Sequence, residues 1–423
     1  MKKKTSKIPR FYKLTPNDRL SYLKDFSNLS DDDLSILQSM SGITLEQAST
    51  MIENAIGGIS IPIGLATNYI INSKEFLIPM AIEESSVIAA SSKSAGIARL
   101  MGGFKAKSLG NIMRSQIQLV NIPDINTATK NILEKKSDLL NIANRTTPTL
   151  HSLGGGAKDI SLKKINTQRG TMLIVEISVD CKDAMGANVC NKIAESLSSI
   201  LEDMTNGKSI LRIVSNLATE RLVEASAIFN KEILGGEEII NRILDATEFA
   251  NNDPYRAVTH NKGIMNGIIA LAIATGQDTR ALESAIHSYA SLTGKYLPLT
   301  NWEKDPSGNL LGRIKLPIPV GVVGGISSVH QSAKICLNIL GVKSASELGE
   351  IMASVGLAQN LAALYALTSE GIQTGHMALH SRNLATSAGA TGELVDKIAN
   401  IMIDEKNVNF QRAKELMNKF NNS

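Results

Sequence analysis

The chain has 423 residues, of which 43% are hydrophobic and 20% charged, a composition typical of a soluble globular protein and not of a disordered one. Lys and Arg number 44 against 40 Asp and Glu, and no basic stripe alternates with aromatic residues, so no nucleic-acid partner is expected. Cys181, Cys190 and Cys336 form no CxxC pair, which argues against a disulfide framework and a zinc site. We therefore expect a cytoplasmic protein without a signal peptide, a membrane segment or a bound metal.

The first part of the chain predicts short capped helices followed by strands. The helices fall within residues 15–57. Their predicted caps are Thr15, Ser30 and Thr44. The apolar residues of 53–72, broken by glycines and a proline, predict a buried strand. A second strand over 75–82 leads into Glu83 and Glu84, and a helix of small residues follows over 87–103.

Residues 110–215 predict a separate α/β unit. ISLKKINTQ, TMLIVEISVDC and LRIVSN are strand-like, and a helix is predicted over residues 183–204. The start of that helix, DAMGAN, suits a phosphate or a nucleotide because helix N-termini bind anions. No GxGxxG occurs in the chain, so the unit is not expected to be a Rossmann domain. The triple glycine at 154–156 indicates a turn.

Residues 217–375 are predicted to be mainly long helices. The exception is 312–325, a strand-like segment whose prolines indicate a sheet edge or a barrel-like corner. A glycine-flanked break is predicted at 371–380. Amphipathic helices over 391–403 and 409–420 then predict a small mobile tail unit.

Two isolated charges interrupt an apolar stretch at residues 255–289. Lys262 precedes an apolar run and Asp278 follows it, and buried charges are costly unless they pair or function. The alternative is a surface lysine before a core helix and an aspartate that caps the next one. Glu83 and Glu84 allow a similar choice between helix-dipole stabilisation and a carboxylate at the mouth of a pocket.

Seven motifs decide between these alternatives when they are taken together. They are ENAIGGISIPIG, EESSVIAA, DAMGAN, SNLAT, THNKGIMNG, ATGQDTR and GHMALHSRN. In this order they resemble the hydroxymethylglutaryl-CoA reductases, in the soluble bacterial class (class II). The resemblance implies an α+β fold in which a helix-rich large domain carries an inserted small non-Rossmann α/β dinucleotide-binding domain and a C-terminal helical flap. The implied bounds are 1–109 with 217–375, 110–216, and 376–423, respectively.

The resemblance also implies site residues, carried over position by position. The implied catalytic residues are Glu84 (rather than Glu83), Lys262, Asp278 and His376. The implied substrate-binding residues are Ser86, Arg256, Asn266 and Gln359. The implied cofactor-binding residues are Asp183, Ala184, Met185, Gly186, Ala187, Asn188, Val189 and Asn216. A homodimer or higher homo-oligomer is implied, with active sites at the interface and ENAIGGISIPIG facing the partner.

The implied reaction interconverts 3-hydroxy-3-methylglutaryl-CoA with mevalonate and CoA by two hydride transfers with NAD(P)H. Lys262 would stabilise the oxyanion, His376 would protonate the CoA thiolate, and a neutral Glu84 in a dry site would donate or accept a proton. Asp278 would link and tune Lys262 and Glu84. The stretch NRTTPTLHSLGGG lacks the acid that would bind an adenosine ribose, which leaves NADH and NADPH both open.

Other function classes fit the sequence less well. A protein that binds CoA or a dinucleotide without turnover would be favoured if a catalytic position were substituted, but all four are present. An acyl-CoA transferase or hydrolase needs a nucleophile, and the chain has no GxSxG. His260, His287 and His380 are interpreted as structural, and no HExxH suggests a metal.

Overall fold

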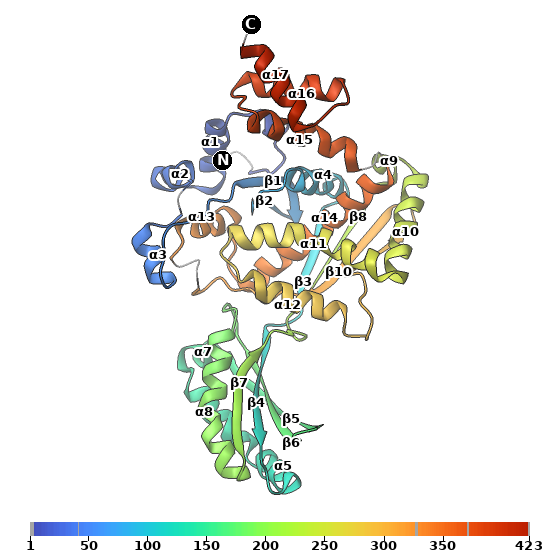
Figure 1. Ribbon diagram of the computed structural model, residues 1–423. Helices are drawn as coiled ribbons and strands as arrows, with labels where there is room; N and C mark the ends of the chain where they lie inside the picture. The colour runs from blue at the N-terminus through green and yellow to red at the C-terminus, as the bar shows by residue number, and fades with distance from the viewer. Residues whose placement is uncertain (1–3, 41, 326–328, 370–371, 422–423) are drawn as a thin grey trace.

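The computed structural model describes residues 4–40, 42–325, 329–369 and 372–421, with the side chains of residues 372–379 outside the description. Its strands form two separate sheets, one of six strands and one of four. The larger sheet lies among most of the helices, and the smaller sheet projects from this body with its own helices (Figure 1).

The first helices begin where the sequence predicts them. After the 3-10 helix η1 (Phe11–Lys13) come α1 (Pro16–Ser27), α2 (Asp31–Gln38) and α3 (Leu45–Met51). The Thr15 side chain accepts a hydrogen bond from the Asp18 amide. Ser30 and Thr44 form capping boxes at the next two helices. The three predicted caps are confirmed.

The segment after α3 differs from the expected buried strand. Strand β1 (Ile63–Ile71) begins only at Ile63, and residues 53–62 form no strand. Ile56 and Ile59 are 99% and 93% exposed. The prediction for residues 53–72 is therefore correct for β1 and wrong before it, because an apolar pattern does not by itself supply a covering surface within the chain.

The large sheet has the order β2-β1-β3-β8-β10-β9. Its other strands are β2 (Lys74–Ala81), β3 (Phe104–Ser108), β8 (Leu222–Phe229), β9 (Thr300–Lys304) and β10 (Leu310–Pro317). The mainly helical prediction for 217–375 missed β8 and β9. β10 pairs with β8 on one side and β9 on the other, so it is not the predicted edge strand. Its Pro317 is tolerated because it is the last residue of the strand.

Helices cover the large sheet and supply most of the core. They are α4 (Val87–Arg99), α9 (Lys231–Leu234), α10 (Glu237–Asn252), α11 (Pro254–Ala274), α12 (Thr279–Ala290), α13 (Gln331–Leu340) and α14 (Ala345–Thr368). α14 packs against α11, and its Leu348, Met352 and Leu361 are fully buried. α14 is long and apolar enough to cross a membrane, but 67% of that stretch is buried inside the protein, as in a core helix.

The small sheet is antiparallel and has the order β5-β6-β4-β7. Its strands are β4 (Ile112–Val120), β5 (Gly156–Thr167), β6 (Gly170–Asp180) and β7 (Lys208–Ser215). The helices beside it are α5 (Ile125–Glu134), α6 (Lys136–Arg145), α7 (Pro148–Ser152) and α8 (Ala187–Thr205). A Rossmann domain has a parallel sheet, so this unit is of another kind. α8 begins at Ala187 and not at the predicted residue 183, which leaves 183–186 as a loop before the helix.

The chain ends in three helices with a small core of their own (Figure 1). They are α15 (Ile372–Ser387), α16 (Glu393–Asp404) and α17 (Phe410–Asn421). Ile398, Met402 and Leu416 are buried between them. α16 and α17 confirm the predicted amphipathic helices. The break predicted at 371–380 is wrong from residue 372 onward, because α15 continues through Gly375; residue 371 lies outside the described residues.

Candidate functional site

Two of the predicted catalytic side chains lie together in the large domain. Glu84 lies in the turn between β2 and α4, and Lys262 lies in the middle of α11, which packs against β2. Lys262 Nζ is 3.6 Å from Glu84 Oε2. The Lys262 and Glu84 side chains are 62% and 41% exposed, so a ligand can reach both of them within a single chain.

The position of Lys262 in its helix corrects one detail of the sequence interpretation. α11 runs without interruption from Pro254 to Ala274, so Lys262 lies within the helix rather than before it. Its neighbours Asn261 and Ile264 are buried while Lys262 is exposed, which places Lys262 on the open face. Asn266 is one turn further along and half-buried, so it shares that face with Lys262.

The backbone beside Glu84 has an unusual conformation. Ser86, a predicted substrate residue and the first residue before α4, has φ 78° and ψ −26°. This left-handed conformation is uncommon for residues with a side chain, and such strain concentrates at functional sites. The strand-to-helix turn therefore holds Glu84 and Ser86 in a defined geometry at the open end of α4.

Asp278 occupies the capping position that the sequence allowed as an alternative. Its carboxylate accepts a hydrogen bond of 3.0 Å from the Ala281 amide at the start of α12. An Arg280 nitrogen lies 3.5 Å from the same oxygen. Within the described residues, these contacts connect Asp278 to α12 and not to Lys262 or Glu84. The expected link between the three catalytic groups stays a prediction.

The remaining predicted catalytic residue, His376, lies on α15. Its side chain lies outside the described residues.

Two predicted substrate residues are partly or fully withdrawn from solvent. Gln359 on α14 is 5% exposed, and its Oε1 has no hydrogen-bond partner among the described residues. A buried polar atom without a partner is costly, so a polar ligand would satisfy it. Arg256, on the first turns of α11, is half-buried, and this burial lowers the pKa of its guanidinium.

His260 belongs to a buried hydrogen-bond chain beside these residues. Its Nε2 lies 2.6 Å from Thr300 Oγ1. The Thr300 hydroxyl and the Trp302 indole N–H both donate to Asn360 Oδ1, at 2.9 Å each. Burial, with a smaller effect of the Arg256 charge, lowers the pKa of His260 to about 4. A histidine that is neutral near pH 7 and bonded in the core agrees with its structural interpretation.

The predicted dinucleotide residues form the loop and first turn of α8. Gly186 has φ 112°, and a Cβ at this position would lie 2.5 Å from Cys181 Sγ, so a side chain does not fit. Asn188 and, at the end of β7, Asn216 are exposed. The 19-residue helix α8 directs its N-terminus to this loop, and helix N-termini favour anions. The residues present therefore fit a ligand with a phosphate group.

Asp183 has a structural role that the sequence did not indicate. Its Oδ1 accepts a hydrogen bond of 2.9 Å from the Ala345 amide at the start of α14. Its carbonyl accepts from the Val322 amide, also at 2.9 Å. These bonds fix the loop to the large domain. Sequence reasoning also missed Gln277, whose Oε1 accepts from the Gly321 amide at 2.9 Å beside the same loop.

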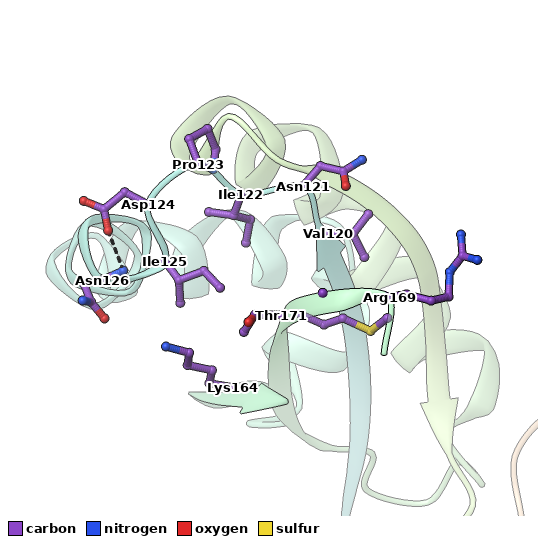
Figure 2. Close-up of a pocket in the computed structure, with 12 residues that line it drawn as sticks. Val120, Asn121, Ile122, Pro123, Asp124, Ile125, Asn126, Lys164, Arg169 and Thr171 are labelled. Atoms are coloured by element: carbon purple, nitrogen blue, oxygen red, sulfur yellow. Dashed lines mark hydrogen bonds between the residues drawn. The ribbon is translucent and has the colours of Figure 1, made fainter. Parts of the chain in front are cut away.

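A separate pocket of about 420 Å³ lies at the far end of the small domain. It is formed by the loop before α5 and by the β5–β6 hairpin, with Lys164 and Thr171 on one side and Ile122 and Ile125 on the other (Figure 2). None of the predicted site residues is among the described residues that line it. The pocket is therefore distinct from the Lys262–Glu84 site.

Comparison with known proteins identifies the family. Residues 15–381 match the family model described as hydroxymethylglutaryl-coenzyme A reductase. The chain belongs to this family. A 3-hydroxy-3-methylglutaryl-coenzyme A reductase from Archaeoglobus fulgidus is 50% identical over 413 residues, which are 98% of this chain and 94% of that protein.

Solved structures of reductases from Streptococcus pneumoniae agree with this family. One is 37% identical with a TM-score of 0.83, and it covers 97% of this chain and 99% of its own. Another, a class II enzyme bound to NADPH in open conformations, is 38% identical with a TM-score of 0.81, over 96% of this chain and 100% of its own. The predicted resemblance to class II reductases, the α+β fold class and the assignment as an enzyme of this family are confirmed.

Proposed function

We propose that the protein interconverts 3-hydroxy-3-methylglutaryl-CoA with mevalonate and CoA, using NAD(P)H. The observation that carries this proposal is the 3.6 Å approach of the Lys262 ammonium to the Glu84 carboxylate at the open face of α11. A cation and a proton-transferring acid side by side are what the reduction of a thioester carbonyl requires of the protein.

Each residue has a proposed task on the substrate. Two reduced nicotinamide dinucleotides, bound one after the other, would supply one hydride each. Lys262 stabilises the oxyanion that develops on the thioester carbonyl oxygen and then on the aldehyde oxygen. His376 protonates the departing CoA thiolate, Glu84 exchanges the proton of the alcohol, and Asp278 tunes the pair. Ser86, Arg256, Asn266 and Gln359 hold the hydroxymethylglutaryl group.

The chemistry needs a site better protected from water than the exposed Lys262–Glu84 pair. Lys262 and Glu84 are 62% and 41% exposed, whereas an oxyanion is stabilised best where water is excluded. We infer that the C-terminal helices α15 to α17 act as a flap that covers the site after the substrate binds. The first turns of α15 carry His376, so closure of the flap would bring that residue to the thiolate.

A second copy of the chain is the proposed cover on another side. Residues 53–62 carry Ile56 and Ile59, which are almost fully exposed. Exposed isoleucines in one short segment mark an interaction surface rather than a solvated loop. We infer that this segment faces a partner subunit in a dimer or higher homo-oligomer, with the active sites at the interface.

The two domains divide the binding tasks in this proposal. The small domain, residues 110–216, binds the dinucleotide through residues 183–189 and Asn216. The large domain, residues 1–109 and 217–375, binds the CoA thioester. The family relative from Streptococcus pneumoniae was solved with NADPH, and here NADPH and NADH are both candidate cofactors. The site of action proposed is the cytoplasm.

The test is loss of NADH or NADPH absorbance when hydroxymethylglutaryl-CoA is added to the purified chain. Two dinucleotides oxidised for each CoA thiol released is the expected stoichiometry of the four-electron reduction. Both cofactors are compared, and the reverse reaction is measured with mevalonate and CoA. Binding of CoA and dinucleotide without any change in absorbance would instead support a binding protein without turnover.

A further inference from the structure

Arg221 is a buried cation with an unusual set of partners. It follows the SNLAT motif, precedes β8, and is only 2% exposed. Its Nη1 donates to the Met185 carbonyl at 2.6 Å, and its Nη2 donates to the carbonyls of Ala184 at 3.0 Å and Val320 at 2.6 Å. One side chain thus connects the loop before α8 to the segment after β10.

The arrangement of these three partners suits arginine better than lysine. All three acceptors are neutral carbonyls. Burial lowers the pKa of Arg221, and the nearby Cys181 and Cys190, followed by Asp180 and Asp183, act in the opposite direction. Burying a cation this way is expensive, so the bonds it makes must serve the fold or the site. A planar guanidinium can donate to three acceptors in one plane, which a lysine ammonium cannot reproduce.

The bond to Met185 orients the start of α8. Because a trans peptide places its C=O and the following N–H on opposite sides, the Gly186 N–H points away from Arg221. Gly186 is the residue before the first turn of α8, where the proposed dinucleotide phosphate would bind. Arg221 therefore sets the direction of an amide at that position without contacting the ligand itself.

Residues 320–322 hold the other side of the same loop. The Val322 amide donates to the Asp183 carbonyl, and Gly321 lies against the loop so closely that a Cβ there would be 2.6 Å from Met185 N. The Gly321 amide in turn donates to Gln277 Oε1, and Gln277 directly precedes Asp278. One continuous set of contacts therefore joins the loop of residues 183–186 to the turn that carries Asp278, a proposed catalytic residue.

We propose that Arg221 is a positioning residue for the dinucleotide site: it holds the loop of residues 183–186 against residues 320–322 in the conformation that binds the cofactor phosphate. This inference rests on the proposed function. It predicts that damage at Arg221 weakens binding of the dinucleotide selectively, whereas a purely structural role would lower stability and leave the two substrates' KM values in the same ratio.

The experiment compares Arg221→Met and Arg221→Lys with the wild-type full-length chain. Losing the bond to the Met185 carbonyl, which orients the Gly186 amide, should raise the dinucleotide Kd and KM about tenfold in Arg221→Met, since one hydrogen bond from a charged donor contributes roughly a factor of ten. The KM for hydroxymethylglutaryl-CoA should stay within about twofold. The dinucleotide Kd and KM of Arg221→Lys should lie between those of the wild type and those of Arg221→Met, because lysine keeps the positive charge but not the planar set of donors.

A second variant changes the other side of the loop of residues 183–186, and it tests the proposal if Arg221→Met does not fold. Gly321→Ala leaves Arg221 intact but places a methyl group against the Met185 backbone, so it should also raise the dinucleotide Kd selectively. Gly207→Ala is the matched control. Its Cβ would lie 2.7 Å from Ile122 Cγ1 at the opposite end of α8, so it strains the same domain far from the loop.

The outcomes separate the two proposals. Selective loss of dinucleotide affinity in the Arg221 and Gly321 variants, but not in Gly207→Ala, supports the inference. Unchanged dinucleotide affinity in variants that only melt at a lower temperature overturns it and leaves the proposed function standing. A wild-type chain that binds no NADH or NADPH overturns the proposed function and the inference together.

Discussion

Removing the Lys262 ammonium should abolish turnover while leaving the fold almost unchanged. The Lys262→Met variant keeps the length and apolar stem of the side chain and deletes its charge. The ion pair with Glu84 is long, at 3.6 Å, and both side chains are exposed, so its loss should change the free energy of unfolding by less than about 1 kcal/mol. Activity and stability can therefore be measured as separate quantities.

The expected effect on the reaction is much larger. A preorganised donor at a developing oxyanion contributes roughly 3–4 kcal/mol to the barrier, which corresponds to a loss in kcat of about 100- to 1000-fold. The ground-state thioester carbonyl carries little charge, so the KM for hydroxymethylglutaryl-CoA should change far less than kcat. Steady-state NAD(P)H oxidation at saturating concentrations of both substrates measures the two constants.

A second exposed lysine provides the control. Lys315 on β10 lies 2.7 Å from Glu224, with side-chain exposures of 46% and 47%, and it is not among the proposed site residues. Lys315→Met should keep wild-type kcat and a similar melting temperature. If Lys262→Met kept more than about a tenth of the wild-type kcat, Lys262 would not be the oxyanion's cation, because a single donor is worth at least tenfold more than that.

Three other changes test the site, the assembly and the fold. Glu84→Gln should lower kcat about 100-fold because it removes a transferable proton, while the adjacent, exposed Glu83→Gln should not; equal kinetics in both variants would refute the assignment. Ile59→Asp, at a residue that is 93% exposed, should leave the melting temperature unchanged below the association concentration but dissociate the oligomer in sedimentation; an unchanged sedimentation coefficient would exclude this segment from the interface. Burial of Glu75 tends to raise its pKa, but hydrogen bonds, chiefly from Arg99, lower it to about 2. The Glu75–Arg99 pair therefore stabilises the folded protein above about pH 4.5, and this contribution is lost as the pH falls toward 2. This 22%-exposed carboxylate thereby contributes roughly 3 kcal/mol at neutral pH, and Arg99→Met should flatten that acid limb of the unfolding curve.

Local signals in the sequence were sufficient for elements whose ends are determined locally. Thr15, Ser30 and Thr44 were identified as caps because a hydroxyl before a helix bonds to amides only two or three residues away. α16 and α17 were predicted from their apolar periodicity. In these cases the residues that make the structure are neighbours in the chain.

β8 was missed because its partners are distant in sequence. Its residues LVEASAIF include alanines and a serine, which have little intrinsic preference for strands. The strand forms because β3 and β10 pair with it on both sides. For the same reason the sequence did not single out Arg221, whose bonded carbonyls include two that lie 36 and 99 positions away in the chain.

The site itself was only partly accessible to sequence reasoning. The pairing of Glu84 with Lys262 depends on α11 packing against β2, and the resemblance to the family, rather than any spacing, suggested it. The exposed Ile56 and Ile59 show the opposite problem. Their apolar pattern predicted a buried strand, which the structure contradicts, whereas the expectation that this segment faces a partner subunit came from the resemblance and stays a prediction.

These two observations point to one consequence for the proposed mechanism. A lysine and a glutamate that are both substantially exposed interact weakly, because water screens each charge, so an isolated chain should be a poor catalyst even with every residue in place. If a partner subunit and the C-terminal helices supply the cover, specific activity should rise with protein concentration through the range in which the chain associates, and Ile59→Asp should shift that rise to higher concentration. Specific activity that is independent of concentration, in a chain shown by sedimentation to dissociate over the same range, would mean that each subunit closes its own site.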